Sequence, residues 1–370
     1  STSRRQRQMC IRDRYNKLLR TILREVRSYM KCSNHEVVID AIMELYNQDR
    51  MEMSVVHGPY SVGKTYIARA LQARLGKGHT IYLLGRLANE SIHIRSIERE
   101  LKVPSGAFKT LEDALRGVFQ ASLDKRIMLI IDDYPSFVDT VPQAPIILRD
   151  LMETYRDHGK VFVLLMGTHV DELKGRILGE SSLIAAYIHN YFKVNPFTLD
   201  DVRALGWDYT DEDLVKLYHV TGGMPGNLVH IDPALSVDEN IVRLFFRPQG
   251  ILCTEPQRLL MRYIRNVGAA NAILYALAQL DKPFYTELCH ASELKSGTFA
   301  TRMADLLDME IIGRIQGGSR GPLRYADYHF VNTMFQFWYQ FVFPNLEEIN
   351  CGQGQYIYDT IAKPALDTLA

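Results

Sequence analysis

The stretch GPYSVGKT at residues 58–65 constrains the fold of this chain more than any other feature. It fits the pattern GxxxxGK[ST], in which glycines let backbone N–H groups turn toward a phosphate and the following helix adds a favourable dipole. The apolar segment 53–57 precedes the motif, and the segment 64–75 after it has a helical pattern. We therefore expect a phosphate-binding loop between a strand and a helix of a parallel α/β sheet.

The loop predicts a site for ATP and Mg²⁺. Lys64 would reach the β- and γ-phosphates, and the hydroxyl of Thr65 would ligate Mg²⁺. A glycine-rich turn with a chance GKT is the alternative, which the acidic strand end farther along the chain disfavours. The predicted nucleotide contacts in this stretch are Gly58, Pro59, Tyr60, Ser61, Val62, Gly63, Lys64, Thr65 and Tyr66.

The second half of the predicted site is IMLIIDDYP at residues 127–135, an apolar run that ends in two carboxylates. Parallel strands place their carboxyl ends at the crevice where ligands bind in open α/β sheets. There Asp132 would hold Mg²⁺, directly or through water, and Asp133 would point toward the attacking water. The structural alternative is that both carboxylates cap the turn at Pro135.

The length of Asp133 bears on the rate of the predicted reaction. A glutamate would bring its carboxylate about 1.5 Å farther forward, the length of one C–C bond. A misplacement of this size can lower a rate roughly 10²-fold, so we expect slow hydrolysis with binding largely unaffected. Thr168, after the fourth predicted strand, would sense the γ-phosphate or position the water; an ordinary helix cap is the alternative.

Composition excludes several other classes of protein. Among 370 residues, Lys+Arg and Asp+Glu are both 43, so net charge indicates neither a nucleic-acid nor a membrane partner. No apolar run approaches the roughly 20 residues that span a bilayer, and no secretory signal opens the chain. The five cysteines form no CxxC pair, which disfavours a zinc site and indicates reduced thiols in a cytoplasmic protein.

The order of predicted elements indicates a doubly wound sheet followed by helical parts. Strands are expected at 53–57, 80–84, 127–131, 161–166 and 192–195, with helices between them. Helices alone follow from residue 198, with one expected to start at Pro256. Near the end, three helices and a hairpin with a tip at 317–321 are typical of a winged helix, and an aromatic helix at 334–343 follows.

These features together resemble the archaeal-type ATPase family, P-loop NTPases of the STAND/AAA+ group. Besides the two motifs above, the resemblance depends on MGTHVDEL at 166–173, YFKVNPFTLDDV at 191–202, HVTGGMPGNL at 219–228 and YHFVNTMFQFWYQFVFPN at 328–345. It implies a strand order 5-1-4-3-2, a helical lid and a winged helix. It also implies that the turn ending in Pro225 contacts the nucleotide; a helix C-cap before a proline-started helix is the plainer interpretation, and both can hold.

Two departures from the family pattern matter. Members often carry Asp-Glu where this chain has Asp132 and Asp133, whereas STAND switch proteins commonly carry Asp-Asp. The family usually continues into a nuclease-like C-terminal domain, which we expect to be truncated here.

Residues 8–14 resemble the translation of a sequencing adapter, and we exclude 1–14 from the fold. The expected parts are an adapter-derived stretch (1–14), a basic amphipathic helix (15–34), the ATPase core (35–197), the helical lid (198–250), the winged helix (251–333) and the aromatic helix with the start of a further domain (334–370).

Two function classes remain open from the sequence. The first is an ATP-dependent switch with slow hydrolysis; the second is a DNA-binding or remodelling component of a defence or mobile-element system. The winged helix would either read DNA or report the nucleotide state internally. The basic helix at 15–34 would be a solvated face or would contact DNA, RNA or an acidic partner. The residues expected near DNA are Lys295, Thr298, Thr301, Arg302, Arg314, Arg320 and Arg324. A nucleotide-dependent homo-oligomer would need an arginine finger, for which Arg149, Arg176 and Arg203 are candidates.

Overall fold

The computed structural model describes residues 34–76, 78–85, 89–168, 182–281, 283–316 and 326–369. Two compact units divide the chain. The first comprises Val37–Asn195 with Leu306–Glu310, and the second consists mainly of Pro196–Asp305 and Ile311–Ala370. The adapter-like stretch and most of the basic helix lie outside the described residues, as do Arg176, Arg320 and Arg324.

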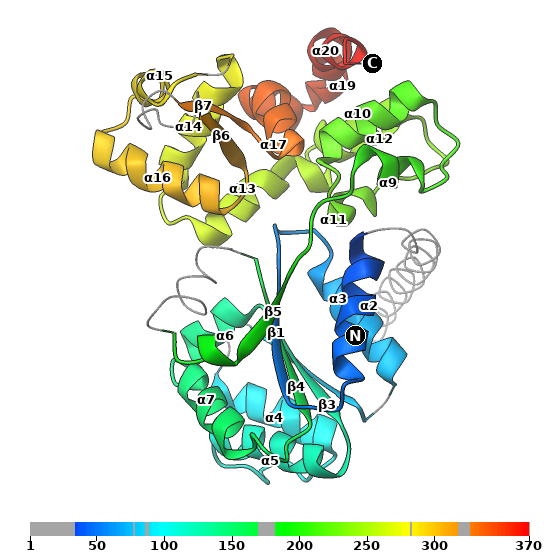
Figure 1. The fold of residues 1–370 in the computed structure, drawn as a ribbon. Coiled ribbons are helices and arrows are strands. Elements are labelled where there is room, and N and C mark those ends of the chain that lie inside the picture. Colours follow the sequence, from blue (N-terminus) through cyan, green and yellow to red (C-terminus); the bar gives the residue numbers. More distant parts are fainter. Residues whose placement is uncertain are drawn as a thin grey trace, which may run out of the picture. The chain divides into compact units, whose positions relative to one another are not determined.

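The first unit is built on a five-stranded parallel sheet (Figure 1). Its order is β2-β3-β4-β1-β5, which confirms the predicted order, and all four pairings are parallel. The carboxyl ends of all the strands therefore lie along one edge. The strands are β1 (Glu52–His57), β2 (Thr80–Leu84), β3 (Ile127–Asp132), β4 (Val161–Gly167) and β5 (Ile188–Lys193).

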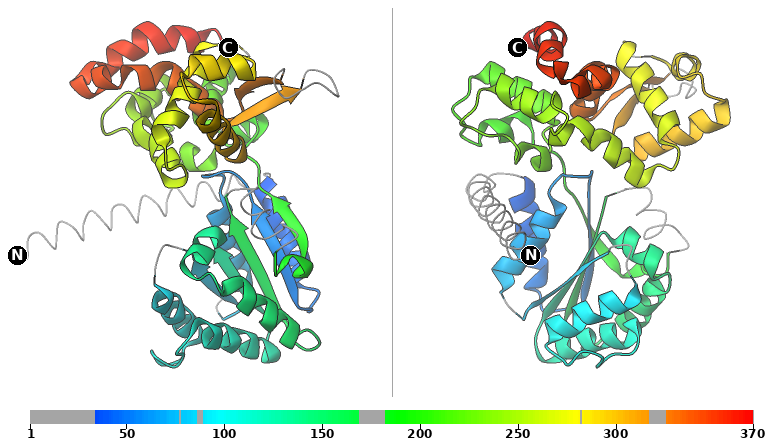
Figure 2. Two further views of the ribbon diagram at one scale, coloured as in Figure 1. Left: turned by 90° about the vertical axis from the view of Figure 1, so that its left-hand side faces the viewer. Right: turned by 180° about the vertical axis from the view of Figure 1, so that it is seen from behind.

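Helices cover both faces of this sheet, as Figure 1 and the rear view in Figure 2 show. On one face lie α2 (Asn34–Tyr46) and α3 (Lys64–Leu75). The other face packs on a buried apolar cluster with α4 (Glu90–Leu101), α5 (Leu111–Asp124), α6 (Tyr134–Thr140) and α7 (Ala144–Thr154). The three central strands β1, β3 and β4 are almost wholly buried. Such burial on both faces explains the continuous apolar runs of β3 and β4.

Three predicted elements differ from the structure. The fifth strand was expected at 192–195 but is Ile188–Lys193, because this edge strand alternates buried and exposed residues and has no apolar run to mark it. The helix α6 was not predicted, since Pro135 was interpreted as a turn; proline is well tolerated in the first turn of a helix. Pro256 was expected to start a helix but lies inside α13 (Ile251–Tyr263).

The second unit begins with four short helices. These are α9 (Leu199–Arg203), α10 (Asp211–Thr221), α11 (Pro225–Leu228) and α12 (Val237–Phe245). After α13 come three helices and a two-stranded antiparallel hairpin, in the predicted order. They are α14 (Val267–Gln279), α15 (Tyr285–Ala291), α16 (Ser296–Asp308), β6 (Ile312–Gln316) and β7 (Ala326–Phe330).

The aromatic segment predicted at 334–343 is helical but irregular. It consists of α17 (Thr333–Phe337), a π-helical turn Trp338–Val342 and a short 3₁₀ turn Phe343–Asn345. The indole of Trp338 donates to the carbonyl of Cys253 at 2.8 Å, and the hydroxyl of Tyr339 donates to Asn271 Oδ1 at 2.7 Å. These bonds fix the segment to α13 and α14, so its aromatic side chains form part of the core of this unit.

The last residues, 346–369, pack against the short helices of the same unit. They contain α18 (Leu346–Glu348), α19 (Gly354–Ile357) and α20 (Lys363–Asp367), joined by π-helical turns. A Cβ on Gly354 would lie 1.8 Å from the carbonyl oxygen of Phe246, so only glycine allows this approach. The hydroxyl of Tyr358 donates to Asp238 Oδ1 at 2.6 Å, and Lys363 forms an ion pair with the same carboxylate.

No helix in the described part of the chain combines the length and the apolar character needed to cross a bilayer.

Candidate functional site

The polar residues predicted to form a site lie at one edge of the sheet. His57, Asp132 and Gly167 end three neighbouring strands, β1, β3 and β4. The phosphate-binding loop follows His57, Asp133 follows Asp132, and Thr168 follows Gly167. Because the strands are parallel, the fold brings these separate parts of the sequence to the same edge.

The loop at 58–63 has the backbone geometry that the motif predicts. Gly58, Ser61 and Gly63 all have positive φ (157°, 62° and 101°), and Gly63 is the N-cap of α3. A Cβ on Gly58 would lie 2.2 Å from the carbonyl oxygen of Val194, so no other residue fits there without displacing the backbone after β5. A loop with such residues can turn its N–H groups inward and form a concave anion-binding surface at the helix N-terminus.

Lys64 is folded back over this loop. Its ammonium donates to the carbonyl oxygens of Gly58 at 2.8 Å and Pro59 at 2.7 Å, and its side chain is buried. The two carbonyl acceptors partly replace the water that the buried ammonium has lost. The two bonds therefore hold the ammonium against the loop.

Asp132 joins the loop to the acidic strand end. Its side chain is 5% exposed, and its Oδ2 accepts a hydrogen bond of 2.8 Å from the hydroxyl of Thr65. The structure thus brings together the two residues predicted to hold Mg²⁺. One carboxylate and one hydroxyl are a donor set that fits Mg²⁺, which usually keeps several waters and is completed by substrate phosphates. No cluster of three or more His, Cys, Asp or Glu that could hold a metal occurs among the described residues, so a metal cage made wholly of protein is not seen there.

Asp133 has a left-handed backbone, with φ 62° and ψ 52°. It is the N-cap residue of α6, but its side chain makes no capping hydrogen bond. Gly85 lies close to the backbone of Asp133, because a Cβ on Gly85 would be 2.2 Å from the carbonyl oxygen of Asp133. Aspartate tolerates this conformation better than most residues, including glutamate. The backbone thus gives a local reason for a short side chain at this position.

The remaining predicted site residues are placed as follows. Thr168 is half-buried directly after β4, and the helix that it was predicted to cap in the alternative interpretation lies outside the described residues. Pro225 is buried at the start of α11, after Gly222, which is the left-handed C-cap of α10. The plainer interpretation of that turn is therefore confirmed, and the nucleotide contact of Pro225 stays a prediction.

The arginine-finger candidates that the structure describes are engaged with acidic neighbours. Arg149 pairs with Asp150 at 2.7 Å. Arg203 forms two hydrogen bonds to Asp211 and one to Asp200, and these bonds raise the pKa of its guanidinium. Both arginines would have to leave these partners to reach a nucleotide.

Some of the residues predicted to contact DNA already have partners within the protein. Arg302 of α16 pairs with Asp305 at 2.7 Å, and the hydroxyl of Thr301 donates to the carbonyl of Gly297. Lys295, in the turn between α15 and α16, is exposed.

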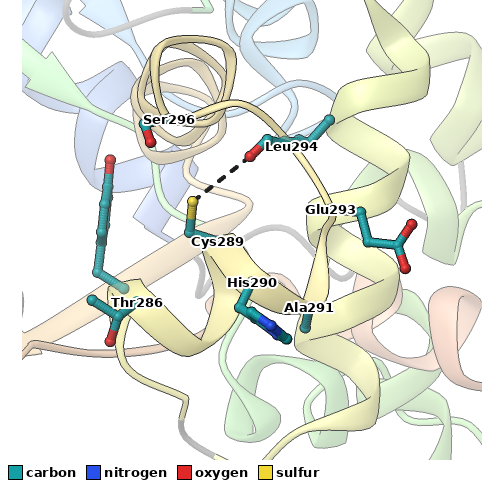
Figure 3. A pocket seen from close by; sticks show the side chains of 8 residues that line it. Thr286, Cys289, His290, Ala291, Glu293, Leu294 and Ser296 are labelled. Carbon is teal, nitrogen blue, oxygen red and sulfur yellow. Dashed lines mark hydrogen bonds between the residues drawn. The ribbon is translucent and has the colours of Figure 1, made fainter.

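The turn that carries Lys295 borders an open pocket of about 890 Å³ (Figure 3), where the thiol of Cys289 donates weakly to the carbonyl of Leu294 at 3.9 Å. The pocket is lined by Tyr285, Thr286, Cys289, His290, Ala291, Glu293, Leu294 and Ser296, none of which was predicted to be functional.

Sequence reasoning missed one residue of the site, Tyr82 on β2. Its hydroxyl donates to Asp132 Oδ2 at 2.8 Å, and the guanidinium of Arg69 lies 4.2 Å from the centre of its ring. Tyr82 lies within the apolar stretch TIYLL, where a tyrosine carries no sign of a site. Only the pairing of β2 with β3 reveals its position.

No family model matches the chain, and no curated protein matches it significantly. Among solved structures, a Walker-type ATPase of Pyrococcus abyssi is similar over 80% of this chain and 93% of its own, with 13% identity and a TM-score of 0.60. The ORC2 protein of Aeropyrum pernix, solved as ADPNP–ADP complexes, is similar over 85% and 93%, with 12% identity and a TM-score of 0.53. At these identities the likeness concerns the fold, and the chain shares the fold of a Walker-type ATPase.

Proposed function

We propose that this chain binds ATP with Mg²⁺ at the carboxyl edge of its sheet and hydrolyses it slowly, as a nucleotide-dependent switch. The observation that carries the proposal is the hydrogen bond of 2.8 Å between Thr65 and Asp132, which lie 67 residues apart. It joins a phosphate-binding loop to an acidic strand end, the two parts that P-loop NTPases require.

The residues of the site have distinct tasks in this proposal. The concave loop holds the β- and γ-phosphates with its N–H groups, and Lys64 exchanges its loop carbonyls for phosphate oxygens. Thr65 and Asp132 hold Mg²⁺, which neutralises negative charge on the phosphates when it is bound. Asp133 orients the attacking water, and Thr168 contacts the γ-phosphate or that water. Tyr60, Val62 and Tyr66 flank the phosphates, and Pro225 is a further nucleotide contact.

The backbone of Asp133 supports slow turnover. A left-handed residue favours aspartate over glutamate, and aspartate places its carboxylate about one C–C bond, roughly 1.5 Å, farther back. Water would be positioned less well and the chemical step would be slow. We expect turnover well below the ~10 s⁻¹ that is the median for enzymes.

The test compares ATP binding and turnover in the wild type and three variants. Lys64→Ala should abolish nucleotide binding, whereas Asp133→Asn should bind ATP and lose hydrolysis. Lys109→Ala, at an exposed lysine before α5, is the matched control and should behave as wild type. Unchanged ATP affinity in Lys64→Ala would remove the assignment of the loop, and wild-type turnover at tens per second would contradict a slow switch.

A second candidate function is ATP-controlled DNA binding by the three helices and hairpin after α13. The exposed Lys295 at the start of α16 favours it, whereas the pairing of Arg302 with Asp305 argues against it. A salt titration of binding to duplex DNA decides, because each phosphate contact contributes about −0.9 to the log–log slope. Loss of about one unit of slope in Lys295→Ala would support DNA contact, and a flat titration would remove it.

A further inference from the structure

Tyr82 is placed by the pairing of β2 with β3. Tyr82 lies opposite Ile130, and Leu84 lies opposite Asp132. Residues two apart on a strand share a face, so Tyr82 and Asp132 point to the same side of the sheet. This is the side that α3 covers, and α3 supplies both Thr65 and Arg69.

Two hydroxyl groups meet on one oxygen of Asp132. Thr65 and Tyr82 each donate to Oδ2 at 2.8 Å, while Oδ1 accepts no hydrogen bond from the residues that the structure describes. Two donors from different directions fix the rotation of a carboxylate, which one donor alone leaves free to turn. The arrangement holds Oδ2 and leaves Oδ1 to a further ligand.

Arg69 packs on the ring of Tyr82 and does not contact the carboxylate of Asp132. It is four residues after Thr65 on α3, so both side chains leave the same side of the helix. Its guanidinium stacks on the ring of Tyr82 at 4.2 Å, and its Nη1 donates to Gln72 Oε1 at 2.8 Å. Both groups that donate to Asp132 are neutral hydroxyls. A cationic partner in the same place would compete with a metal ion.

We propose that Tyr82 is a positioning residue of the magnesium site, which orients the Asp132 carboxylate so that Oδ1 meets Mg²⁺ or one of its waters. This inference rests on the proposed function. Hydrogen bonds to a ligating carboxylate are known to tune metal affinity, and their loss typically lowers it 10- to 100-fold. Tyr82 should therefore affect the magnesium dependence of nucleotide binding and leave metal-free binding unchanged.

The experiment measures equilibrium binding of a fluorescent ADP analogue, in EDTA and across a Mg²⁺ titration. Tyr82→Phe removes the hydroxyl and keeps the ring on which Arg69 stacks. We expect its affinity in EDTA to match wild type and its half-saturating Mg²⁺ concentration to rise about tenfold. Arg69→Leu should shift the same midpoint in the same direction by a smaller factor.

The matched control is Tyr46→Phe. Its hydroxyl also donates a buried hydrogen bond, to the carbonyl of Arg126 at 2.9 Å, but this bond lies just before the amino end of β3 rather than at its carboxyl end. It should leave the Mg²⁺ midpoint unchanged. A wild-type midpoint in Tyr82→Phe would overturn the positioning role, and so would an equal loss of affinity with and without Mg²⁺, which a purely structural role would give. Wild type that binds no nucleotide in either condition would instead overturn the proposed function and the inference with it.

Discussion

The two edges of the parallel sheet use buried charge in opposite ways. At the carboxyl edge, Asp132 is held by the hydroxyls of Thr65 and Tyr82. At the amino edge, the carboxylate of Glu52 is 1% exposed and is contacted by Arg50 at 3.2 Å, Asn190 at 3.1 Å and His189 at 3.3 Å.

Arg126, just before β3, belongs to the same amino edge. It lies 5.0 Å from the centre of the Tyr46 ring and 3.9 Å from Asp49. Burial, opposed by Asp49 and Tyr46, lowers the pKa of its guanidinium. The comparison indicates that charges at the amino edge serve the fold, whereas the proposed function uses the charge at the carboxyl edge to hold a ligand.

The largest expected effect comes from Gly58→Ala at the carboxyl edge. The new Cβ would meet the carbonyl of Val194 at 2.2 Å and would also force alanine into a positive φ. We expect a loss of about 2 to 4 kcal/mol in the free energy of unfolding, from overpacking and backbone strain together. Urea denaturation measures it.

Gly76→Ala is the control for that variant. Its φ is 78°, but nothing lies within 4 Å of a Cβ there, so only the strain of about 1 kcal/mol applies. Equal losses in the two variants would show that the close approach at Gly58 does not constrain the loop.

Two substitutions, one at each edge of the sheet, test whether the two buried carboxylates contribute differently to stability. Glu52→Gln should lower the free energy of unfolding by about 1 to 2 kcal/mol, because it removes a buried charge from beside the guanidinium of Arg50, which is itself largely exposed. Asp132→Asn should change it by less than about 1 kcal/mol, since its hydroxyl partners are neutral.

Nucleotide binding in the presence of Mg²⁺ should show the reverse order. Asp132→Asn should lose it and Glu52→Gln should keep it. A larger loss of stability in Asp132→Asn than in Glu52→Gln would end the distinction between the edges.

A buried histidine away from both edges should make the stability of the protein depend on pH. His93 of α4 is buried with its ring 4.7 Å from that of Phe137, and burial lowers its pKa below 6.5, against the opposing effect of Glu90. The unfolded state therefore binds more protons, and stability falls as the pH drops below about 6.5. Between pH 7.5 and 5.5 we therefore expect His93 to contribute a loss in the free energy of unfolding.

His93→Leu should remove this part of the acid sensitivity. The measurement is chemical denaturation of both proteins at the two pH values, so that other histidines with lowered pKa values, such as His219 and His230, cancel. An identical pH dependence in the variant would show that His93 does not resist protonation.

The smallest effect is expected beside the site, at Tyr134. Its side chain is 1% exposed, and its hydroxyl has no hydrogen-bond partner within the described ranges; burial raises its pKa. Tyr134→Phe should leave stability unchanged or raise it by up to about 1 kcal/mol, because an unsatisfied hydroxyl is removed. A clear loss of stability on thermal or urea unfolding would reveal a partner for this hydroxyl.

Sequence reasoning found those parts of the site whose chemistry is local. The loop at 58–65 carries its own geometry, and Asp132 could be placed because a parallel sheet aligns the ends of its strands. The strand order was available only through the resemblance to a family. Tyr82 could not be found, because its role depends on the register between β2 and β3, whose residues are 50 apart along the chain. The left-handed backbone of Asp133 was hidden for a similar reason, since it depends on the close approach of Gly85.

The contact between Gly354 and Phe246 has a consequence for solubility. Residues 346–369 supply Ile349, Tyr358 and Leu366, all nearly inaccessible to solvent, to the second unit. A shortened protein that stopped before residue 346 would expose the aromatic surface around Phe246. Exposed apolar patches of this kind promote aggregation. Shortened versions meant to isolate the ATPase fold should therefore keep this segment with the short helices that it covers, or remove the second unit entirely.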